Sequence, residues 1–456
     1  MAKFYSSLTE IKSKLKSGEA TVEKLVDGYL DRIQANKHLN VFNEVFADEA
    51  IARSKEVDTR IKQGTAGKLA GMVIAIKDNI CYKGHKVTAS SKILTGFTSI
   101  FSSTIVERLL AEDAIIIGRC NCDEFAMGAS NESSYFGPVK NYADNARVSG
   151  GSSGGSAVAV QAGMCHAAIG TDTGGSVRQP AAFCGVIGFK PTYGRISRHG
   201  IIAYASSFDQ VGPITRSVED AALLYSIMAG ADSYDSTLSQ KPVNAGKVSS
   251  DGSKKKIAYL QEAVSSQGVD AEVKTSLINQ IEKLRADGHT VEPVSFEYLD
   301  YLVPSYYILA TAEASSNLAR YDGVHYGYRS EASTDLTSTY KKSRSEGFGK
   351  EVKRRIMLGT FVLSSGYYDA YYAKAQKVRR LIREKTENIL EEYDFLLVPT
   401  APEPAYEIGK GETDPVRSYM ADIFTVQASL AGVPAISLPV GNNSKGLPLG
   451  LQLLTK

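Results

Sequence analysis

The sequence predicts an α/β protein in which apolar strands are buried between helices. Two short apolar runs, 72–76 and 114–117, have the length and composition of buried strands. Similar runs at 257–260, 395–398 and 435–439 lie close to helical stretches in the second half of the chain. With 456 residues and 43% hydrophobic content, the chain can bury a large core, as one big domain or two ordinary ones.

Residues 1–65 read as a helical N-terminal segment. Ser7-Leu-Thr-Glu10 has the pattern of a capping box, and Gly18 is a suitable end for the first helix. Thr21 is a suitable N-cap for a second, amphipathic helix over 22–33. The segment is therefore expected to pack its helices beside the strands that follow.

Residues 66–220 contain the first predicted strands and form the expected core. Residues 233–256 are rich in Ser, Lys and Gly with little periodicity, which predicts a surface connection whose lysine run is a solvated edge. In the remaining part, 257–456, we expect the strands to complete one sheet together with helices at 271–286 and 371–392.

Composition excludes several classes of protein. No apolar run approaches the ~20 residues of a membrane span, and no apolar segment of a secretory signal follows the N-terminus. The five cysteines are sparse for this length, so a disulfide framework is not expected. The formal net charge is only +2, which gives the chain no strong field for holding nucleic acid by itself. These observations predict a cytoplasmic protein with reduced thiols.

Two glycine- and serine-rich tracts carry the functional signal. They run over Gly150–Ser156 (GGSSGGS) and Gly170–Ser176 (GTDTGGS). Glycine lets the backbone turn sharply and approach a ligand closely, so such loops either cradle an anion or hold a serine beside donors for an oxyanion. The first tract lacks the lysine of a phosphate-binding P-loop.

Lys77 ends the apolar run 73–76 and is a candidate base. To act as a base at pH 7 it must lose its proton, although the usual pKa of lysine is about 10.4. Lowering that pKa by ~3.4 units requires ~4.6 kcal/mol, which burial among apolar and small residues can supply. A serine nucleophile served by a lysine base is therefore chemically feasible.

These motifs, taken together, resemble the amidase signature family. The resemblance rests on Ala75–Asn79 (AIKDN), on the two glycine- and serine-rich tracts, and on the continuations Phe183–Arg195 and Ser207–Pro213. Three motifs occur in the family's order and spacing. The resemblance implies a single amidase domain over 1–456, with a large mixed β-sheet covered by helices on both faces.

The same resemblance assigns a Ser–Ser–Lys triad. Ser176 is implied as the nucleophile, Lys77 as the base and Ser152 as the bridge between them, in a cis peptide linkage. The backbone N–H groups of Thr173, Gly174, Gly175 and Ser176 are implied as the oxyanion hole.

Each of these residues has an alternative role. Ser176 could cap a helix that begins near Val177, and Ser153 and Ser156 compete with Ser152 for the bridge. The six histidines lie in no G-x-S-x-G or H-E-x-x-H pattern, and Cys120-Asn-Cys122 lacks a second pair for zinc, so neither a Ser–His–Asp triad nor a metal site is expected. The apolar neighbours of Cys184 favour a buried, inert thiol.

The second half resembles the glutaminase subunits of tRNA-dependent amidotransferases, on the stretches 313–323, 343–360 and 363–372. Glutamine carries an α-carboxylate and an α-ammonium group, so a selective pocket needs a cation and an anion. The resemblance assigns the carboxylate to Arg355, the ammonium group to Asp422 and a hydroxyl contact to Tyr306, with Tyr307 as the adjacent alternative.

The resemblance also implies partners. Ammonia released from glutamine would pass to a B subunit that converts Glu-tRNA(Gln) to Gln-tRNA(Gln) with ATP and Mg²⁺, and a C subunit would join the two. No cofactor is expected in this chain. The family continues into a helical tail beyond the position of Lys456. Two other function classes stay open, namely a stand-alone amidase for small amides and a non-enzymatic anion-binding scaffold.

Overall fold

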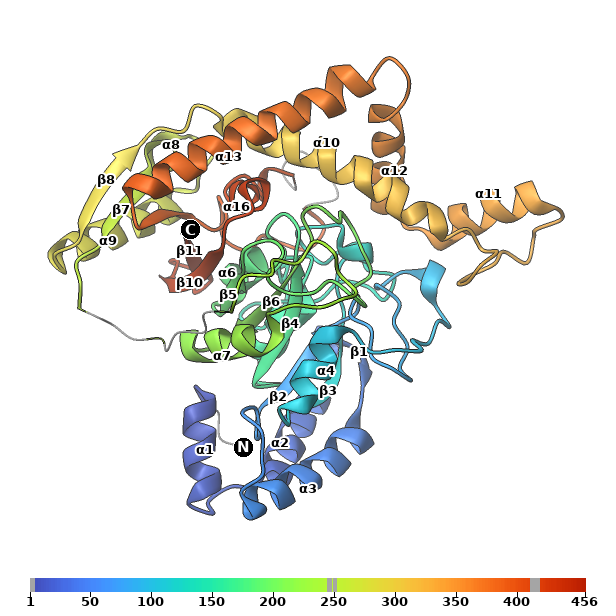
Figure 1. Cartoon of the computed structure of the whole chain (residues 1–456), viewed down its shortest axis with the longest axis vertical. Helices are drawn as coiled ribbons and strands as arrows, with labels where there is room; N and C mark the ends of the chain where they lie inside the picture. Colours follow the sequence, from blue (N-terminus) through green and yellow to red (C-terminus); the bar gives the residue numbers. More distant parts are fainter. Residues whose placement is uncertain (1–4, 244–247, 249–251, 411–418) are drawn as a thin grey trace.

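One mixed sheet of eleven strands forms the centre of the protein, as predicted, and it takes strands from both halves of the chain (Figure 1). The computed structural model describes residues 5–243, 248, 252–410 and 419–456. The strand order is β1-β3-β2-β4-β6-β5-β10-β11-β9-β7-β8. The strands are β1 (Phe42–Val45), β2 (Val73–Lys77), β3 (Ile115–Cys120), β4 (Ala167–Asp172), β5 (Ile187–Lys190), β6 (Gln210–Thr215), β7 (Lys256–Leu260), β8 (Thr290–Val294), β9 (Phe395–Pro399), β10 (Ala435–Asn442) and β11 (Pro448–Leu454).

The two halves join where β10 pairs with β5. This antiparallel ladder places Ala435 opposite Lys190 and Ser437 opposite Gly188. Parallel pairs hold β2 between β3 and β4, and β7 between β8 and β9, while the strands at the junction are antiparallel. The strands of the second half therefore complete the sheet of the first, which agrees with the expectation of one sheet.

The central strands are covered on both faces. Every residue of β2, β3, β4 and β6 is buried. Because successive side chains of a strand point to opposite faces, a strand without an exposed residue needs packing on each side. The hydrophobic runs 72–76 and 114–117, which predicted β2 and β3, are therefore a direct consequence of the place of these strands inside the sheet, whereas β4 and β6 were not predicted.

Helices supply that cover. The central strands contact α5 and α7, α6 packs on β5, β10 and β11, and the strands of the second half contact α9. The long helices α10 and α13 lie side by side over the second half of the sheet, and α11 projects from the molecule (Figure 1). The helices are α1 (Leu8–Lys16), α2 (Val22–Ala35), α3 (Ala47–Gln63), α4 (Thr104–Ala111), α5 (Gly154–Gln161), α6 (Arg178–Cys184), α7 (Val218–Met228), α8 (Gln261–Ser265), α9 (Ala271–Ala286), α10 (Leu299–Asn317), α11 (Leu336–Gly347), α12 (Lys350–Val362), α13 (Lys374–Glu392) and α16 (Val426–Ala431).

The N-terminal segment contains the predicted helices and one strand that was not predicted. Ser7 accepts a hydrogen bond from the N–H of Glu10, and Thr21 caps α2 in the same way. The carboxylate of Glu10 receives the N–H of Ser6, so the predicted capping box is only half formed. The short run at 42–45 alternates too little to signal a strand, yet it pairs with β3 as β1 at one edge of the sheet.

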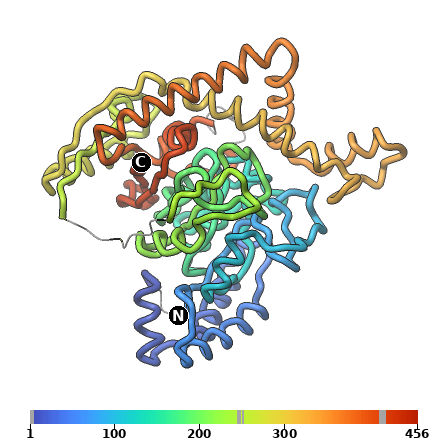
Figure 2. The backbone as a smooth tube through the Cα atoms, in the orientation of Figure 1, coloured from blue at the N-terminus to red at the C-terminus, as the bar shows by residue number. Residues whose placement is uncertain are grey.

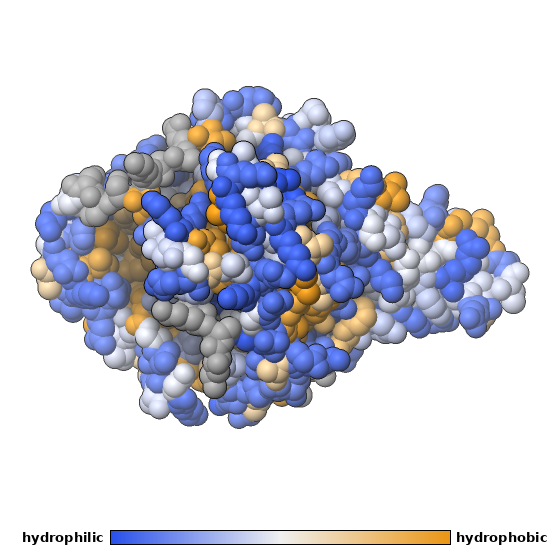
Figure 3. All heavy atoms as spheres, turned by 90° about the horizontal axis from the view of Figure 1, so that it is seen from below, coloured by the Kyte–Doolittle hydropathy of each residue, from blue (hydrophilic) through white to orange (hydrophobic). Residues whose placement is uncertain are grey.

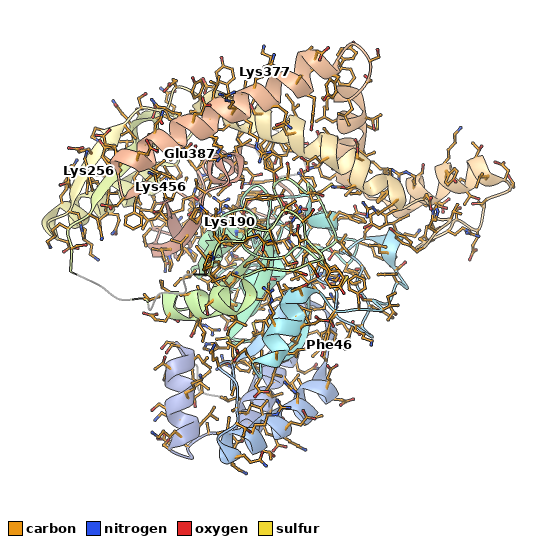
Figure 4. All side chains as sticks on the ribbon, in the orientation of Figure 1. Phe46, Lys190, Lys256, Lys377, Glu387 and Lys456 are labelled. Atoms are coloured by element: carbon orange, nitrogen blue, oxygen red, sulfur yellow. The ribbon has the colours of Figure 1, made fainter. Side chains whose placement is uncertain are left out.

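The connection between the halves begins as a packed segment. Asp235 and Leu238 are buried, and Asp235 forms an ion pair with Arg198. Figure 2 shows the described part of this segment at the end of the green half of the chain, and residues 244–247 and 249–251 of the predicted connection lie outside the described residues. The predicted lysine run ends in Lys256 at the start of β7, where it pairs with Glu392 at 2.9 Å, far from the buried Lys190 (Figure 4).

The surface is mostly hydrophilic on the face shown in Figure 3, with small apolar areas between charged side chains. Among the described residues, no helix combines the length and the apolar character that crossing a membrane requires.

Candidate active site

Lys77 lies at the end of β2 with its amine completely buried. The Nζ atom lies 2.7 Å from Ser152 Oγ, 2.9 Å from Ser153 Oγ and 3.0 Å from Thr171 Oγ1. Burial lowers the pKa of Lys77 from its usual 10.5 to about 8. The direction is the one that a lysine base needs, because the neutral amine becomes accessible near physiological pH.

The first glycine- and serine-rich tract brings both Ser152 and Ser153 to this amine. The Gly151–Ser152 peptide bond is cis. Ser153 is also engaged by Thr171, since its hydroxyl donates to the Thr171 carbonyl at 3.2 Å. Ser156, the third serine, lies in α5, and its hydroxyl donates to the carbonyl of Ile169 in β4 instead. The structure therefore reduces the three candidates for the bridge to two, and Ser152 is the nearer.

Ser176 follows β4 in the second tract and is 8% exposed, whereas Lys77 and Ser152 are fully buried. Its carbonyl accepts a hydrogen bond from the N–H of Ser153 at 3.2 Å, so the two tracts touch. Ser176 does not cap α6, which begins at Arg178 after Val177. The N-cap residue is Val177, and the carboxylate of Asp172 accepts hydrogen bonds from the N–H groups of Val177 at 3.2 Å and Arg178 at 3.4 Å.

Glycine is required at two positions of the turn before Ser176. Gly175 has φ +143°, a conformation that side chains rarely adopt, and a β-carbon there would lie 2.3 Å from Thr425 Oγ1. A β-carbon on Gly174 would lie 2.6 Å from the hydroxyl of Tyr306. Side chains of the second half thus pack directly on the turn that the family resemblance assigns to the oxyanion hole.

Two buried carboxylates hold this turn in place. Asp209 accepts from Thr173 Oγ1 at 2.6 Å and from the N–H of Tyr204 at 2.9 Å. Asp172 forms a two-point ion pair with Arg178 at 3.0 Å on each side, and both side chains are fully buried. Such pairs fix geometry through two parallel bonds. Thr173 and Ser176 therefore stand on a segment that is anchored before and after the turn.

Arg355 is almost fully buried on α12 among aromatic rings. Its Nε donates to Glu351 at 2.8 Å and its NH1 donates to the hydroxyl of Tyr204 at 3.0 Å. The guanidinium carbon lies 5.2 Å from the ring centroid of Tyr307 and 5.8 Å from that of Tyr419. A cation among tyrosine faces is held by the negative face of each ring.

Asp422 lies on the other side of Tyr307. The hydroxyl of Tyr307 donates to Asp422 Oδ2 at 2.8 Å, and burial raises the pKa of this carboxyl to about 7. Asp422 also connects to the turn, since its carbonyl accepts from the N–H of Thr425 at 3.0 Å. Tyr307 thus contacts Arg355 through its ring and Asp422 through its hydroxyl, and these are the cation and the anion that the family resemblance assigns to the head group of an amino acid.

The family resemblance assigns a hydroxyl contact to Tyr306, with Tyr307 as the alternative, and the two tyrosines have different neighbours in the structure. Tyr306 lies against Gly174 and Tyr307 against Asp422. Three further residues at the site were not predicted from the sequence, namely Tyr204, Glu351 and Asp209. Of these, only Glu351 has a signal in the sequence, since residues four apart on a helix face each other and Arg355 follows at that spacing.

The other histidine and cysteine candidates have structural surroundings, although Cys122 lies near Lys77. His166 is buried and bonds Asp220 at 2.8 Å, and all five cysteines are buried and unpaired by disulfides. Burial alone raises the pKa of the Cys184 thiol far above its usual range. Among the described residues, no three His, Cys, Asp or Glu side chains are grouped as a metal site would require.

Comparison with known proteins gives a consistent answer over the whole chain. Residues 24–456 match the Amidase family. The chain is 51% identical over 453 residues to the A subunit of the glutamyl-tRNA(Gln) amidotransferase of Chlorobium luteolum, covering 99% of this chain and 93% of that protein.

Solved structures agree. The A subunit of the glutamyl-tRNA(Gln) amidotransferase of Thermotoga maritima superposes with a TM-score of 0.80 at 40% identity, covering 98% of this chain and 90% of that one. The peptide amidase of Stenotrophomonas maltophilia superposes equally well, with a TM-score of 0.80, at only 29% identity and with 98% and 92% of the two chains covered. The fold is therefore shared with both types of enzyme, and the sequence is more similar to the first.

Proposed function

The chain belongs to the Amidase family, and we propose that it is the glutamine-hydrolysing subunit of a tRNA-dependent amidotransferase. The ammonia that it releases converts Glu-tRNA(Gln) to Gln-tRNA(Gln). Relatives with about half of their residues identical over nearly the whole chain carry the name of that subunit. The proposal also rests on the site, since the buried amine, the serines and the charged pair occur together in one region.

In the proposed reaction, neutral Lys77 accepts a proton from Ser152, which in turn takes the proton of Ser176. The oxygen of Ser176 then attacks the side-chain amide carbon of glutamine, and the backbone N–H groups of Thr173, Gly174, Gly175 and Ser176 stabilise the oxyanion. The proton returns along the same path to the leaving nitrogen, so ammonia departs and a γ-glutamyl ester remains. Water attacks this ester, and glutamate and free Ser176 are formed.

Recognition of glutamine rests on the two charges beside Tyr307. Arg355 holds the α-carboxylate and Asp422 holds the α-ammonium group, while Tyr306 keeps the turn and the pocket in contact. Glu351 occupies one edge of the Arg355 guanidinium, and Tyr204 receives one of its remaining donors. The head group of the substrate would then be fixed at a set distance from Ser176.

In this proposal the acceptor chemistry belongs to partners in the cytoplasm. A B subunit uses ATP and Mg²⁺ to activate Glu-tRNA(Gln), and a C subunit joins the two larger chains. No step at Lys77, Ser152 or Ser176 needs a nucleotide or a metal. The competing function is a stand-alone amidase, which would use the same serines and lysine without the head-group pair.

The observation that carries the choice is the contact of Tyr307 with both Arg355 and Asp422. The test is to express this chain alone and with candidate B and C subunits, and to measure glutamate release with and without ATP and Glu-tRNA(Gln). We expect weak activity alone, stimulation in the loaded complex, formation of Gln-tRNA(Gln), and loss of all three with Ser176→Ala. Full turnover of unrelated amides by the isolated chain, without complex formation on gel filtration, would favour the stand-alone amidase.

A further inference from the structure

Glu124 is a buried carboxylate outside the triad. It lies between α12, the recognition helix that carries Arg355, and the serine loop, which is the tract Gly150–Ser156. Glu124 is only 2% exposed and lines a hollow of about 210 Å³ near the start of α12, together with Lys92, Ser133 and Glu346. The proposed reaction gives Glu124 no role. Burying an ionisable group is costly unless it is bonded, so its partners indicate what it does.

Those partners lie on two segments far apart in the sequence. The N–H of Gly349 donates to both carboxylate oxygens of Glu124, at 2.8 and 3.1 Å, and the hydroxyl of Ser91 donates to one of them. Burial raises the pKa of Glu124 to about 7, while these two bonds act to lower it. A carboxylate at this position also faces the positive end of the α12 dipole.

Gly349 is the N-cap residue of α12, and its lack of a side chain permits this contact. A β-carbon at Gly349 would lie 2.4 Å from Glu124 Oε2. The φ angle of Gly349 is −69°, so the backbone itself places no demand for glycine there. A side chain at Gly349 would therefore displace the carboxylate of Glu124.

The residue before Glu124 holds the other end of the connection. The N–H of Asp123 donates to the carbonyl of Ser152 at 3.1 Å. The Asp123 carboxylate lies so close to Gly151 that a β-carbon there would be 2.1 Å from Oδ2. Two successive residues, Asp123 and Glu124, thus bond Ser152 of the serine loop on one side and Gly349, the N-cap of α12, on the other.

The distance along α12 makes this anchor relevant to substrate binding. Arg355 lies six residues after Gly349, which is about 9 Å along a helix. A tilt or shift of the start of α12 would move the guanidinium relative to Ser176. The contacts of Arg355 with Glu351 and Tyr204 fix its rotamer, and Tyr204 reaches the turn before Ser176 through Asp209. Neither contact holds the start of α12, which Glu124 bonds instead.

We propose that Glu124 is a positioning residue for glutamine specificity, which sets the place of Arg355 relative to the serine loop through its bonds to the start of α12. This inference rests on the proposed function, because it assumes that Arg355 binds the α-carboxylate. It concerns only substrates that carry this group. A simple amide meets the same serines and lysine and gains nothing from Arg355.

The test compares glutamine with propionamide as substrates for the full chain in complex with its partner subunits. Glu124→Gln keeps the size of the side chain but removes its charge and one acceptor oxygen. We expect kcat/KM for glutamine to fall about 10-fold, mainly through KM, while kcat/KM for propionamide stays within about two-fold. Gly349→Ala should give the same selective loss, because its new methyl group displaces the same carboxylate.

The matched control is Glu346→Gln, because Glu346 lines the same hollow. Its carboxylate accepts hydrogen bonds from the hydroxyls of Tyr328 and Ser330 and not from the start of α12. This variant should leave both substrates unchanged. The double variant Glu124→Gln/Gly349→Ala should lose no more than the more damaging single variant, because both changes break one contact. Melting temperatures exclude simple unfolding as the cause.

Three results would overturn the inference. The first is an equal loss of kcat/KM for glutamine and propionamide in Glu124→Gln, and the second is an unchanged KM for glutamine in that variant. The third is a double variant whose loss, in kcal/mol, equals the sum of the losses of the two single variants. A wild-type enzyme that does not prefer glutamine over propionamide would instead refute the proposed function itself, and the two failures are therefore distinguishable.

Discussion

The hydroxyl of Tyr306 occupies the space that a side chain on Gly174 would need, since a β-carbon there would lie 2.6 Å from it. Tyr306 belongs to α10 in the second half of the chain, whereas Gly174 belongs to the turn before Ser176. The two halves of the protein therefore meet at the site where the oxyanion would form. This contact makes the geometry of the turn dependent on the packing of α10.

Substituting Gly174 tests that dependence. Gly174→Ala should lower kcat for glutamine by about 10²- to 10³-fold, because the methyl group must push either Tyr306 or the backbone donors out of place. The double variant Gly174→Ala/Tyr306→Leu removes the clash and should recover part of the activity. Steady-state kinetics with a thermal melt check this, and a double variant no better than Gly174→Ala would show that Tyr306 is not the cause.

The proton path predicts non-additive losses. Lys77→Ala and Ser152→Ala should each reduce turnover by several orders of magnitude, because members of one relay act as a unit. The double variant should be no slower than the worse single variant. Ser153→Ala is the informative comparison, since its hydroxyl also lies within 2.9 Å of Lys77. A larger loss with Ser153→Ala than with Ser152→Ala would move the bridge to Ser153.

The pKa of Lys77 predicts the pH profile. Because burial lowers it to about 8, the neutral base accumulates as the pH rises, and kcat/KM should increase up to about pH 8 and then level off. The unfolded chain binds this proton up to about pH 10.5, so the same shift makes folding more favourable as the pH rises from 8 to 10.5. A profile that is flat between pH 6 and 9 would argue against a lysine base.

The head-group pair predicts selective loss of glutamine use. Arg355→Ala or Asp422→Asn should lower kcat/KM for glutamine by the equivalent of about 2–5 kcal/mol. Each change leaves one charge of the bound glutamine head group buried without its oppositely charged partner. Hydrolysis of propionamide should be spared. Met357→Ala, a change at an exposed position of the same helix, is the control. Unchanged glutamine kinetics in both variants would support the stand-alone amidase.

The sequence alone was sufficient for features that depend on neighbours along the chain. The predicted helix at 271–286 has the same bounds as α9, and the strand at 257–260 differs from β7 by one residue. Periodicity and capping signals are local, so they survive without knowledge of the fold. The glycine- and serine-rich tracts were equally visible, because a turn that approaches a ligand closely needs glycine in its own sequence.

Tertiary structure decided the contacts between distant segments. Arg178 bonds Gln452, 274 residues away, because β10 and β11 enter the sheet beside β5. The roles of Tyr204, Asp209 and Glu124 depend on such neighbours, and so does the division between Tyr306 and Tyr307. The sequence around a tyrosine or a carboxylate is the same whether its side chain faces solvent or a site. Only the assembly of both halves of the chain into one sheet therefore brings these side chains to the site.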